Sequence, residues 1–198
     1  VRAGKAVEAL PETTVASSFQ LYQELGLRGE VNFPAFEQAL KGFSRYASGQ
    51  DRLLVLIDYT KPSTEKRFYI LDLLQKKLLL STYVAHGRGS GDNYAVAFSN
   101  RPGSYQSSLG FFRTGDTYMG KNGYSLFLDG LEKGINDKAR ERAIVVHGAN
   151  YADPAVLKGQ QRLGRSLGCP ALPPDISKQV IDTIKGGVLL YIYGLNKA

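Results

Sequence analysis

Apolar residues in the first 50 positions recur at the spacing of helices. In residues 16–28 they share one face, at Phe19, Tyr22, Leu25 and Leu27. This first predicted helix ends beside two glycines. A second helix is predicted from Pro34, a favourable first-turn residue, to a stop at Gly49. We therefore expect an N-terminal helical cap or extension within residues 1–50.

From residue 53 the pattern changes to short runs rich in Val, Ile, Tyr and Phe. Three runs separated by turn-type residues predict an antiparallel meander over 53–59, 67–73 and 78–85. Further strands are predicted over 124–128, 143–147 and 188–193, and short helices over 136–142 and 173–185. Residues 87–123 are rich in Gly, Ser and Asn and predict a long functional loop, in which only 105–113 resembles an irregular strand or hairpin. The sequence thus predicts a mainly β (α+β) domain over residues 51–198 with one or two inserted helices.

Composition and charge narrow the class of protein. Of 198 residues 43% are apolar, which argues against disorder. The 25 Lys and Arg against 18 Asp and Glu give a net charge of +7, but they are dispersed, so we expect an anionic partner and no nucleic acid. No run approaches the roughly 18 apolar residues that span a bilayer, so no transmembrane segment is expected. The chain begins at Val1 and not at Met, which suggests a removed leader and an extracytoplasmic location.

The scarce Cys and His residues are the candidates for chemistry. One Cys and two His allow no intrachain disulfide and give too few ligands for a metal, so neither a metal nor a cofactor is expected. His147 ends a predicted strand, and Cys169 lies in a Gly-flanked loop 22 residues later. A Cys/His pair is a minimal nucleophile and base. The backbone N–H groups of Leu167, Gly168 and Cys169 could stabilise an oxyanion. From these residues alone, a buried Cys and a structural His that never meet remain an open alternative.

Several motifs resemble those of a known enzyme family. The pair His147-Gly148 and the segment 166–169 (Ser-Leu-Gly-Cys) resemble the signature of the YkuD-type L,D-transpeptidases, which cross-link bacterial peptidoglycan through a catalytic Cys. Further segments are similar to the murein L,D-transpeptidase catalytic domain, namely 86–91, 98–100, 107–110 and 164–170. The resemblance covers about residues 53–193. It implies a β-sandwich or flattened barrel.

The resemblance also implies roles for individual residues. Cys169 would attack a carbonyl of a donor tetrapeptide stem, release D-Ala and form a thioester, while His147 would move the protons and the Gly148 carbonyl would orient its ring. The implied partners are peptidoglycan stem peptides, with carbapenems as covalent inhibitors. The implied location is the periplasm or cell envelope.

Departures from the family pattern identify the candidate substrate contacts. Leu167 replaces the usual His of the Ser/Thr-His-Gly-Cys motif, and Pro170-Ala171 replaces an apolar-Arg pair, so Arg165 is the candidate to supply the missing Arg contact. Ser166 is expected to shape the Cys turn. His86 either lines the cleft or bonds to a loop carbonyl. The remaining candidates for the cleft are Tyr118, Ser108 and Asn136.

Two other functions remain open on the same residues. With water in place of the amine, the site would be an L,D-carboxypeptidase or endopeptidase. In a non-catalytic module that binds the cell wall, the basic surface would hold murein and Cys169 would be buried and inert.

Overall fold

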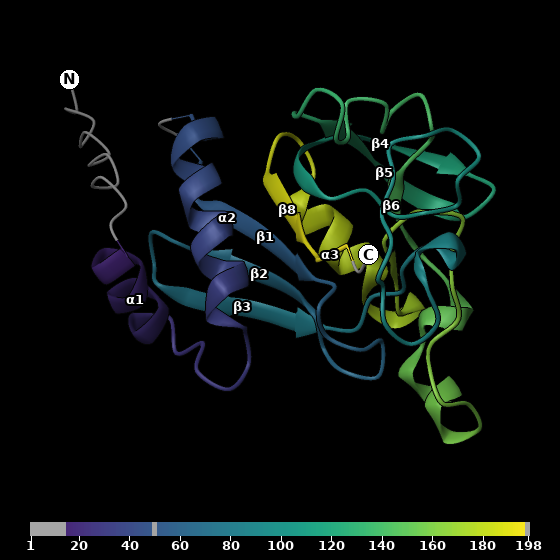
Figure 1. Cartoon of the computed structure of the whole chain (residues 1–198), viewed down its shortest axis with the longest axis horizontal. Coiled ribbons are helices and arrows are strands. Elements are labelled where there is room, and N and C mark those ends of the chain that lie inside the picture. Colours follow the sequence, from purple (N-terminus) through teal and green to yellow (C-terminus); the bar gives the residue numbers. More distant parts are fainter. Residues whose placement is uncertain (1–14, 49–50, 197–198) are drawn as a thin grey trace.

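The computed structural model describes residues 15–48 and 51–196 (Figure 1). The strands of this part are β1 (Leu53–Asp58), β2 (Phe68–Asp72), β3 (Lys77–Thr82), β4 (Gly110–Gly120), β5 (Gly123–Gly130), β6 (Val145–Gly148), β7 (Ala171–Leu172) and β8 (Leu189–Tyr193). Its α-helices are α1 (Val15–Glu24), α2 (Phe33–Tyr46) and α3 (Pro174–Ile184). The mixed α+β composition agrees with the predicted fold class.

The strands form one mixed sheet that is nearly closed into a barrel. Their order is β3-β2-β1-β8-β4-β5-β6-β7, with parallel pairing only for β1–β8 and β6–β7. The predicted meander is confirmed as the antiparallel series β1, β2, β3. Past β3 the chain reaches the other edge of the sheet, where Ala85 pairs with Ala171 and Gly87 with Ser166. These two bridges close the barrel at the segment that contains Cys169.

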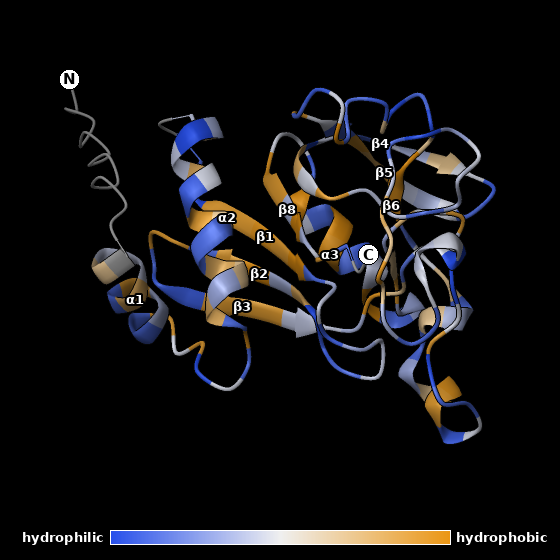
Figure 2. Ribbon diagram, viewed as in Figure 1, coloured by the Kyte–Doolittle hydropathy of each residue, from blue (hydrophilic) through white to orange (hydrophobic). Residues whose placement is uncertain are grey.

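Two apolar cores lie on the two faces of this sheet. In Figure 2 the orange of apolar residues dominates β1, β8 and much of α3. The helix α2 covers one face, and its buried Phe36, Leu40 and Phe43 pack with Leu54 and Leu56 of β1. The helix α3 fills the other face, where its apolar side packs against β6 and β5. Both predicted helices of the N-terminal segment exist, and α2 is part of the core.

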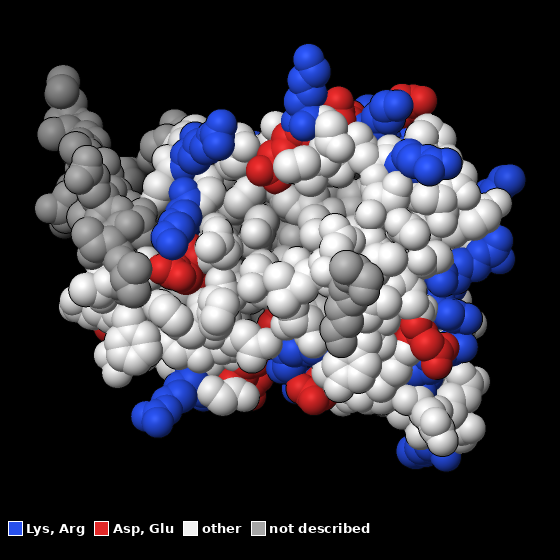
Figure 3. All heavy atoms as spheres, viewed as in Figure 1, with Lys and Arg blue, Asp and Glu red and all other residues white. Residues whose placement is uncertain are grey.

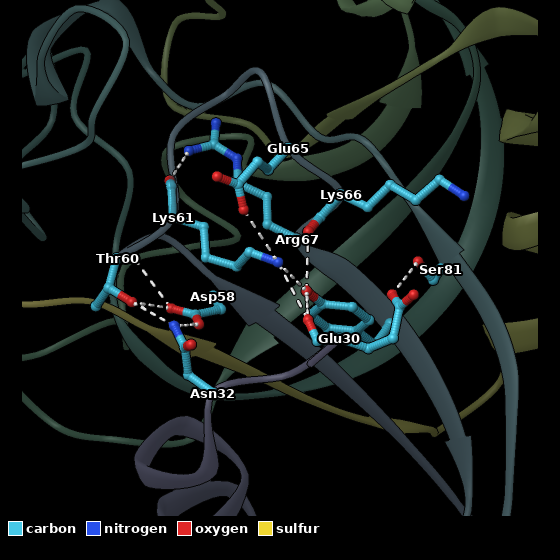
Figure 4. Close-up of polar contacts among 10 residues, drawn as sticks. Glu30, Asn32, Asp58, Thr60, Lys61, Glu65, Lys66, Arg67 and Ser81 are labelled. Carbon is cyan, nitrogen blue, oxygen red and sulfur yellow. Dashed lines mark hydrogen bonds and ion pairs between the residues drawn. The ribbon is translucent and has the colours of Figure 1, made fainter. Parts of the chain in front are cut away.

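Hydrogen bonds also fasten the α1–α2 segment to the sheet (Figure 4). The Asn32 amide donates to Asp58 at 2.7 Å, and the hydroxyl of Tyr69 donates to the carbonyl of Glu30 at 2.8 Å. The ammonium of Lys61 donates to the same carbonyl at 3.1 Å. The connection between α1 and α2 is therefore anchored to strands β1 and β2 by polar contacts as well as by the core.

Two expectations from the sequence are wrong. The predicted loop 87–123 contains the whole of β4, an 11-residue strand, of which only residues 110–113 fall in the segment predicted as an irregular strand or hairpin. Pairing with β5 and β8 on both sides overrides its content of Gly and polar residues. The predicted helix over 136–142 is a series of turns with mixed i−3 and i−4 hydrogen bonds. Apolar periodicity alone was too weak to identify either segment.

Candidate active site

Closure of the barrel fixes both ends of the turn that contains Cys169. Before the turn, Ser166 donates its N–H to the carbonyl of His86 at 2.9 Å and accepts from the N–H of Arg88 at 2.8 Å. After the turn, Ala171 and Ala85 exchange two backbone hydrogen bonds, of 2.8 and 3.2 Å. The nucleophile candidate is thus held between two sheet bridges and does not lie on a free loop.

Inside the turn, the hydroxyl of Ser166 makes two hydrogen bonds. It donates to the carbonyl of Cys169 at 2.6 Å and accepts from the N–H of Gly168 at 3.1 Å. Gly168 has φ +130°, and a Cβ there would lie 3.0 Å from the carbonyl of Gln106, so the position favours glycine. Of the three amides expected to face an oxyanion, that of Gly168 is therefore engaged. Those of Leu167 and Cys169 have no acceptor within the described residues.

His147 lies at the end of β6 with its ring 3% exposed. Its Nδ1 atom lies 2.9 Å from the carbonyl of Gly148, the acceptor expected from the sequence. A carbonyl only accepts, so Nδ1 carries the proton and Nε2 has a free lone pair. Burial lowers the pKa of His147, against a smaller raising effect of the Gly148 hydrogen bond. The ring is therefore neutral at pH 7 and suited to act as a base.

The register of the sheet places Cys169 beside the strand that contains His147. His147 pairs with Ala171 in the parallel β6–β7 ladder, so Cys169, two residues before Ala171, lies beside Val145. The N–H of Val145 hydrogen-bonds to the sulfur, and the thiol donates to the carbonyl of Ala143 at 3.5 Å. Alternation along a strand places Val145 and His147 on the same face. The sulfur and the imidazole therefore belong to adjacent positions on one face of the sheet.

The thiol of Cys169 is protonated at rest. Burial raises its pKa above the usual value, while the N–H of Val145 and the charge of Arg142 lower it. Its residue is only 8% exposed. Because the thiol and the imidazole are both neutral, a reaction at the sulfur requires a base that removes the thiol proton.

His86 lies beneath the Cys turn and not at its surface. Its ring is 1% exposed, accepts from the guanidinium of Arg67 at 2.8 Å and lies 3.4 Å from the carbonyl of Gly91. Burial, followed by the charge of Arg67, lowers the pKa of His86 to about 3. Of the two roles considered for His86, the bond to a loop carbonyl is the one that the structure contains.

The other candidate substrate contacts are spread around this centre. Arg165 donates to the carbonyl of Gly91 at 2.9 Å and lies 3.6 Å from the carboxylate of Asp92. Tyr118 on β4 stacks on Phe127, with ring centroids 4.4 Å apart. It is in the same row of the sheet as His147, because Ser125 pairs with both.

Two further candidates are buried and bonded to backbone or to Arg142. The hydroxyl of Ser108 donates to the carbonyl of Ser99 at 2.8 Å and accepts from Arg142 at 2.5 Å. Asn136 donates to the carbonyls of Leu109 and Phe111 at 2.8 and 3.0 Å. Ser108 therefore joins the segment at Ser99 to Arg142, and Asn136 holds the start of β4.

Sequence reasoning missed Arg142, whose guanidinium lies next to the Cys turn. It was counted among the dispersed basic residues. The only sequence signal was its place just before the strand that ends in His147. Arg142 is the cation whose charge acts on the sulfur, and Arg165 is paired elsewhere.

The wider surface adds few constraints. On the face shown in Figure 3, Lys and Arg are scattered along the outline and interspersed with Asp and Glu. Within residues 15–48 and 51–196, no group of three or more His, Cys, Asp or Glu could hold a metal ion. No helix in that same part of the chain is long and apolar enough to cross a membrane.

Comparison with known proteins finds a family model that matches most of the chain. A family model described as L,D-transpeptidase catalytic domain matches residues 27–193, which include α2 as well as the whole barrel. No curated protein matches the chain.

Solved structures to which the chain is similar include three bacterial proteins. LD transpeptidase LdtMt1 in complex with imipenem is 14% identical over 72% of this chain, with a TM-score of 0.43. The helical cell shape determining protein Pgp2 of Campylobacter jejuni is 16% identical over 75% of this chain and 50% of its own, with a TM-score of 0.48. An L,D-transpeptidase of Stackebrandtia nassauensis is 13% identical over 92% of this chain and 78% of its own, with a TM-score of 0.43. The chain spans 59% of the length of LdtMt1.

Proposed function

The chain belongs to the L,D-transpeptidase catalytic domain family, and from this premise we propose that it cross-links peptidoglycan stem peptides through a thioester on Cys169. The observation that carries the proposal is the paired register of β6 and β7. It sets a neutral His147, with Nε2 free, on the strand that contacts the Cys169 sulfur. The substrate lies in the cell envelope, so the proposal includes an extracytoplasmic location.

The first half-reaction forms the acyl-enzyme. Nε2 of His147 takes the thiol proton as the sulfur attacks the carbonyl carbon of the donor stem. The oxyanion of the tetrahedral intermediate is accommodated by the amides of Leu167 and Cys169. The carbon–nitrogen bond then breaks, His147 returns the proton to the departing D-Ala nitrogen, and a thioester remains.

The second half-reaction releases the enzyme. The amine of an acceptor stem loses a proton to His147 and attacks the thioester carbonyl. The carbon–sulfur bond breaks, and the proton passes from His147 to the sulfur, which restores the thiol. The carbonyl of Gly148 accepts a hydrogen bond from Nδ1 in both half-reactions, so that Nε2 faces the reacting atoms each time.

The test is intact-protein mass after incubation with imipenem. The parent protein should gain one adduct, Cys169→Ala should gain none, and His147→Ala should react at least about a hundredfold more slowly because the base is absent. Lys178→Ala, at a side chain 79% exposed, is the matched control and should react like the parent. An inert parent whose thiol also resists iodoacetamide until unfolding would refute the proposal and favour the wall-binding alternative.

Product analysis separates transfer from hydrolysis. With a tetrapeptide donor and an amine acceptor, the proposal predicts a cross-linked product and free D-Ala. If tripeptide alone accumulates at saturating acceptor, the enzyme is an L,D-carboxypeptidase working through the same Cys169 and His147.

A further inference from the structure

Arg142 is a half-buried cation without a carboxylate partner in the described part of the chain. Four of its N–H groups go to neutral acceptors. Nη1 donates to the carbonyl of Ser99 and the hydroxyl of Ser108, and Nη2 donates to the carbonyl of Gln106 and the hydroxyl of Ser104, at 2.7, 2.5, 2.7 and 3.2 Å. Hydrogen bonds of this kind fix the guanidinium in place and leave its charge uncompensated.

Neighbouring arginines are arranged differently. Arg140, two residues earlier, makes a two-pronged ion pair with the carboxylate of Asp129 and is 49% exposed. Arg162 forms an ion pair with the carboxylate of Asp92, and Arg165 lies 3.6 Å from the same carboxylate. Arg140 thus has a carboxylate of its own, and Arg162 and Arg165 share that of Asp92, whereas Arg142 has no carboxylate partner among the described residues.

The uncompensated charge lies against the Cys turn. Nη2 of Arg142 is 3.6 Å from the point that a Cβ on Gly168 would occupy. The next residue, Ala143, has φ 53° and presents the carbonyl that accepts the thiol hydrogen of Cys169. The segment 142–145 therefore surrounds the sulfur with one carbonyl, one N–H and one cation.

We propose that Arg142 is a positioning residue of the nucleophile, whose fixed charge stabilises the Cys169 thiolate that forms when His147 takes the proton. The inference rests on the proposed function. Arg142 acts through Cys169 and not on the substrate, because the loop 99–108 occupies four of its five N–H groups. The interaction is reciprocal: the Arg142 charge lowers the pKa of Cys169, and the Cys169 charge raises that of Arg142.

Few other groups titrate near the sulfur. Tyr59 and Tyr151 interact electrostatically with Cys169, but burial raises the pKa of each to about 12, so both are neutral over the range of interest. His147 lies on the adjoining strand. Burial lowers the pKa of His147 below its usual value, so above about pH 6.5 its ring stays neutral and the pH dependence of alkylation reports the ionisation of the thiol.

The experiment is the rate of iodoacetamide alkylation of Cys169 from pH 6 to 10 in the full chain. In Arg142→Gln the apparent pKa of the thiol should rise by about one unit, which makes the reaction roughly tenfold slower at each pH below the parent's pKa. Arg142→Lys keeps the charge, so the thiol pKa should shift by less than half as much as in Arg142→Gln. Arg140→Gln removes a compensated charge nearby and should leave the profile unchanged.

Three results decide the inference. An unchanged pKa in folded Arg142→Gln, or an Arg142→Lys profile as shifted as that of Arg142→Gln, would overturn it, since charge would then not be the cause. If Arg142→Gln does not fold, Ser108→Asp places a carboxylate against Nη1 and should raise the thiol pKa in the same direction; no rise would overturn the inference. Alkylation needs no peptide, so the proposed function can fail, with no cross-linked product, while the thiol shift remains.

Discussion

The half of the barrel covered by α2 is held mainly by its apolar core, whereas the half that contains Cys169 adds many hydrogen bonds from side chains to backbone atoms to the core beneath α3. In the first, Phe36, Phe43 and Leu54 are almost fully buried in an apolar core against β1 and β2. In the second, short strands and turns are joined by side chains that bond to backbone atoms. The hydroxyl of Ser107, for example, accepts from the N–H of Gly87 at 3.0 Å and donates to the carbonyl of Gly168 at 3.3 Å.

The difference predicts which kinds of substitution each half tolerates. Apolar contacts are not directional, so a core accepts changes that keep volume and loses stability when volume is removed. Buried hydrogen bonds depend on single atoms, so an isosteric change can leave a donor or acceptor unpaired. Free energy of unfolding should therefore be most sensitive to volume near α2, and reactivity of the thiol most sensitive to single polar atoms around the Cys turn.

The largest expected effect on stability comes from removing side-chain volume from the apolar core between α2 and the sheet. Phe36 is fully buried, so Phe36→Ala should lower the free energy of unfolding by about 4 kcal/mol, measured by urea denaturation. Phe19→Ala, at a ring 46% exposed, is the control and should cost less than about 1 kcal/mol. The thiol of Cys169 should become reactive toward iodoacetamide at the same urea concentration at which the helix signal is lost. Two separated transitions would show that the α2 half unfolds independently of the site, as an appended extension would.

The second effect probes polar atoms at the border of the two halves. Arg67 is fully buried and donates to the carbonyls of Val84 and Lys61 and to His86. Arg67→Met keeps much of the volume but leaves these acceptors unpaired, and should cost about 3 kcal/mol in urea denaturation. Arg88→Met, at an exposed guanidinium over the ring of Tyr105, should change stability by less than about 0.5 kcal/mol. Equal losses in the two variants would contradict the contrast.

The same contrast explains which parts of the fold could be predicted from the sequence. The α2 half shows regular apolar spacing, and both helices and the meander β1–β3 were predicted from it. Most of the strand β4 was missed because Gly110, Gly115 and Gly120 interrupt its pattern, and because one of its two pairing partners, β8, is distant in sequence.

The candidate site was found by a different signal. His147 and Cys169 are rare residue types in a recognisable motif, so they could be identified without knowing the fold. The contacts of Arg67, Ser107 and Arg142 could not, because bonds to backbone carbonyls and N–H groups have no periodicity and no fixed spacing. The motif identifies the candidate pair, whereas the atoms that support it can be identified only from the coordinates.

The third effect follows from the two buried imidazoles in the Cys169 half. The pKa of His86 is lowered to about 3, and that of His147 is also lowered, so each is neutral when folded and binds a proton more readily when unfolded. Stability is therefore full above pH 6.5 and is lost as the pH falls toward the folded pKa. Between pH 6.5 and 5, His86 should contribute a loss of up to about 2 kcal/mol, at about 1.4 kcal/mol per pH unit, and His147 should add to the loss in the same direction. In urea denaturation, the free energy of unfolding of His86→Gln should fall less steeply with pH in this window than that of the parent. Equal slopes would contradict the conclusion that His86 is neutral in the folded protein.

The smallest expected effect on stability separates structure from reactivity at the Cys turn. Ser166→Ala removes the hydroxyl that holds the N–H of Gly168 and the carbonyl of Cys169, at a cost of about 1 kcal/mol in unfolding. The imipenem acylation rate should fall by about tenfold or more, because the turn that presents the sulfur loses its internal brace. Ser81→Ala, whose hydroxyl contacts Glu30 in the α2 half at 3.5 Å, is the matched control and should leave acylation unchanged. If Ser166→Ala reacts like the parent, the two bridges at Ala85 and Gly87 alone hold the nucleophile, and closure of the barrel, not the polar turn, sets its position.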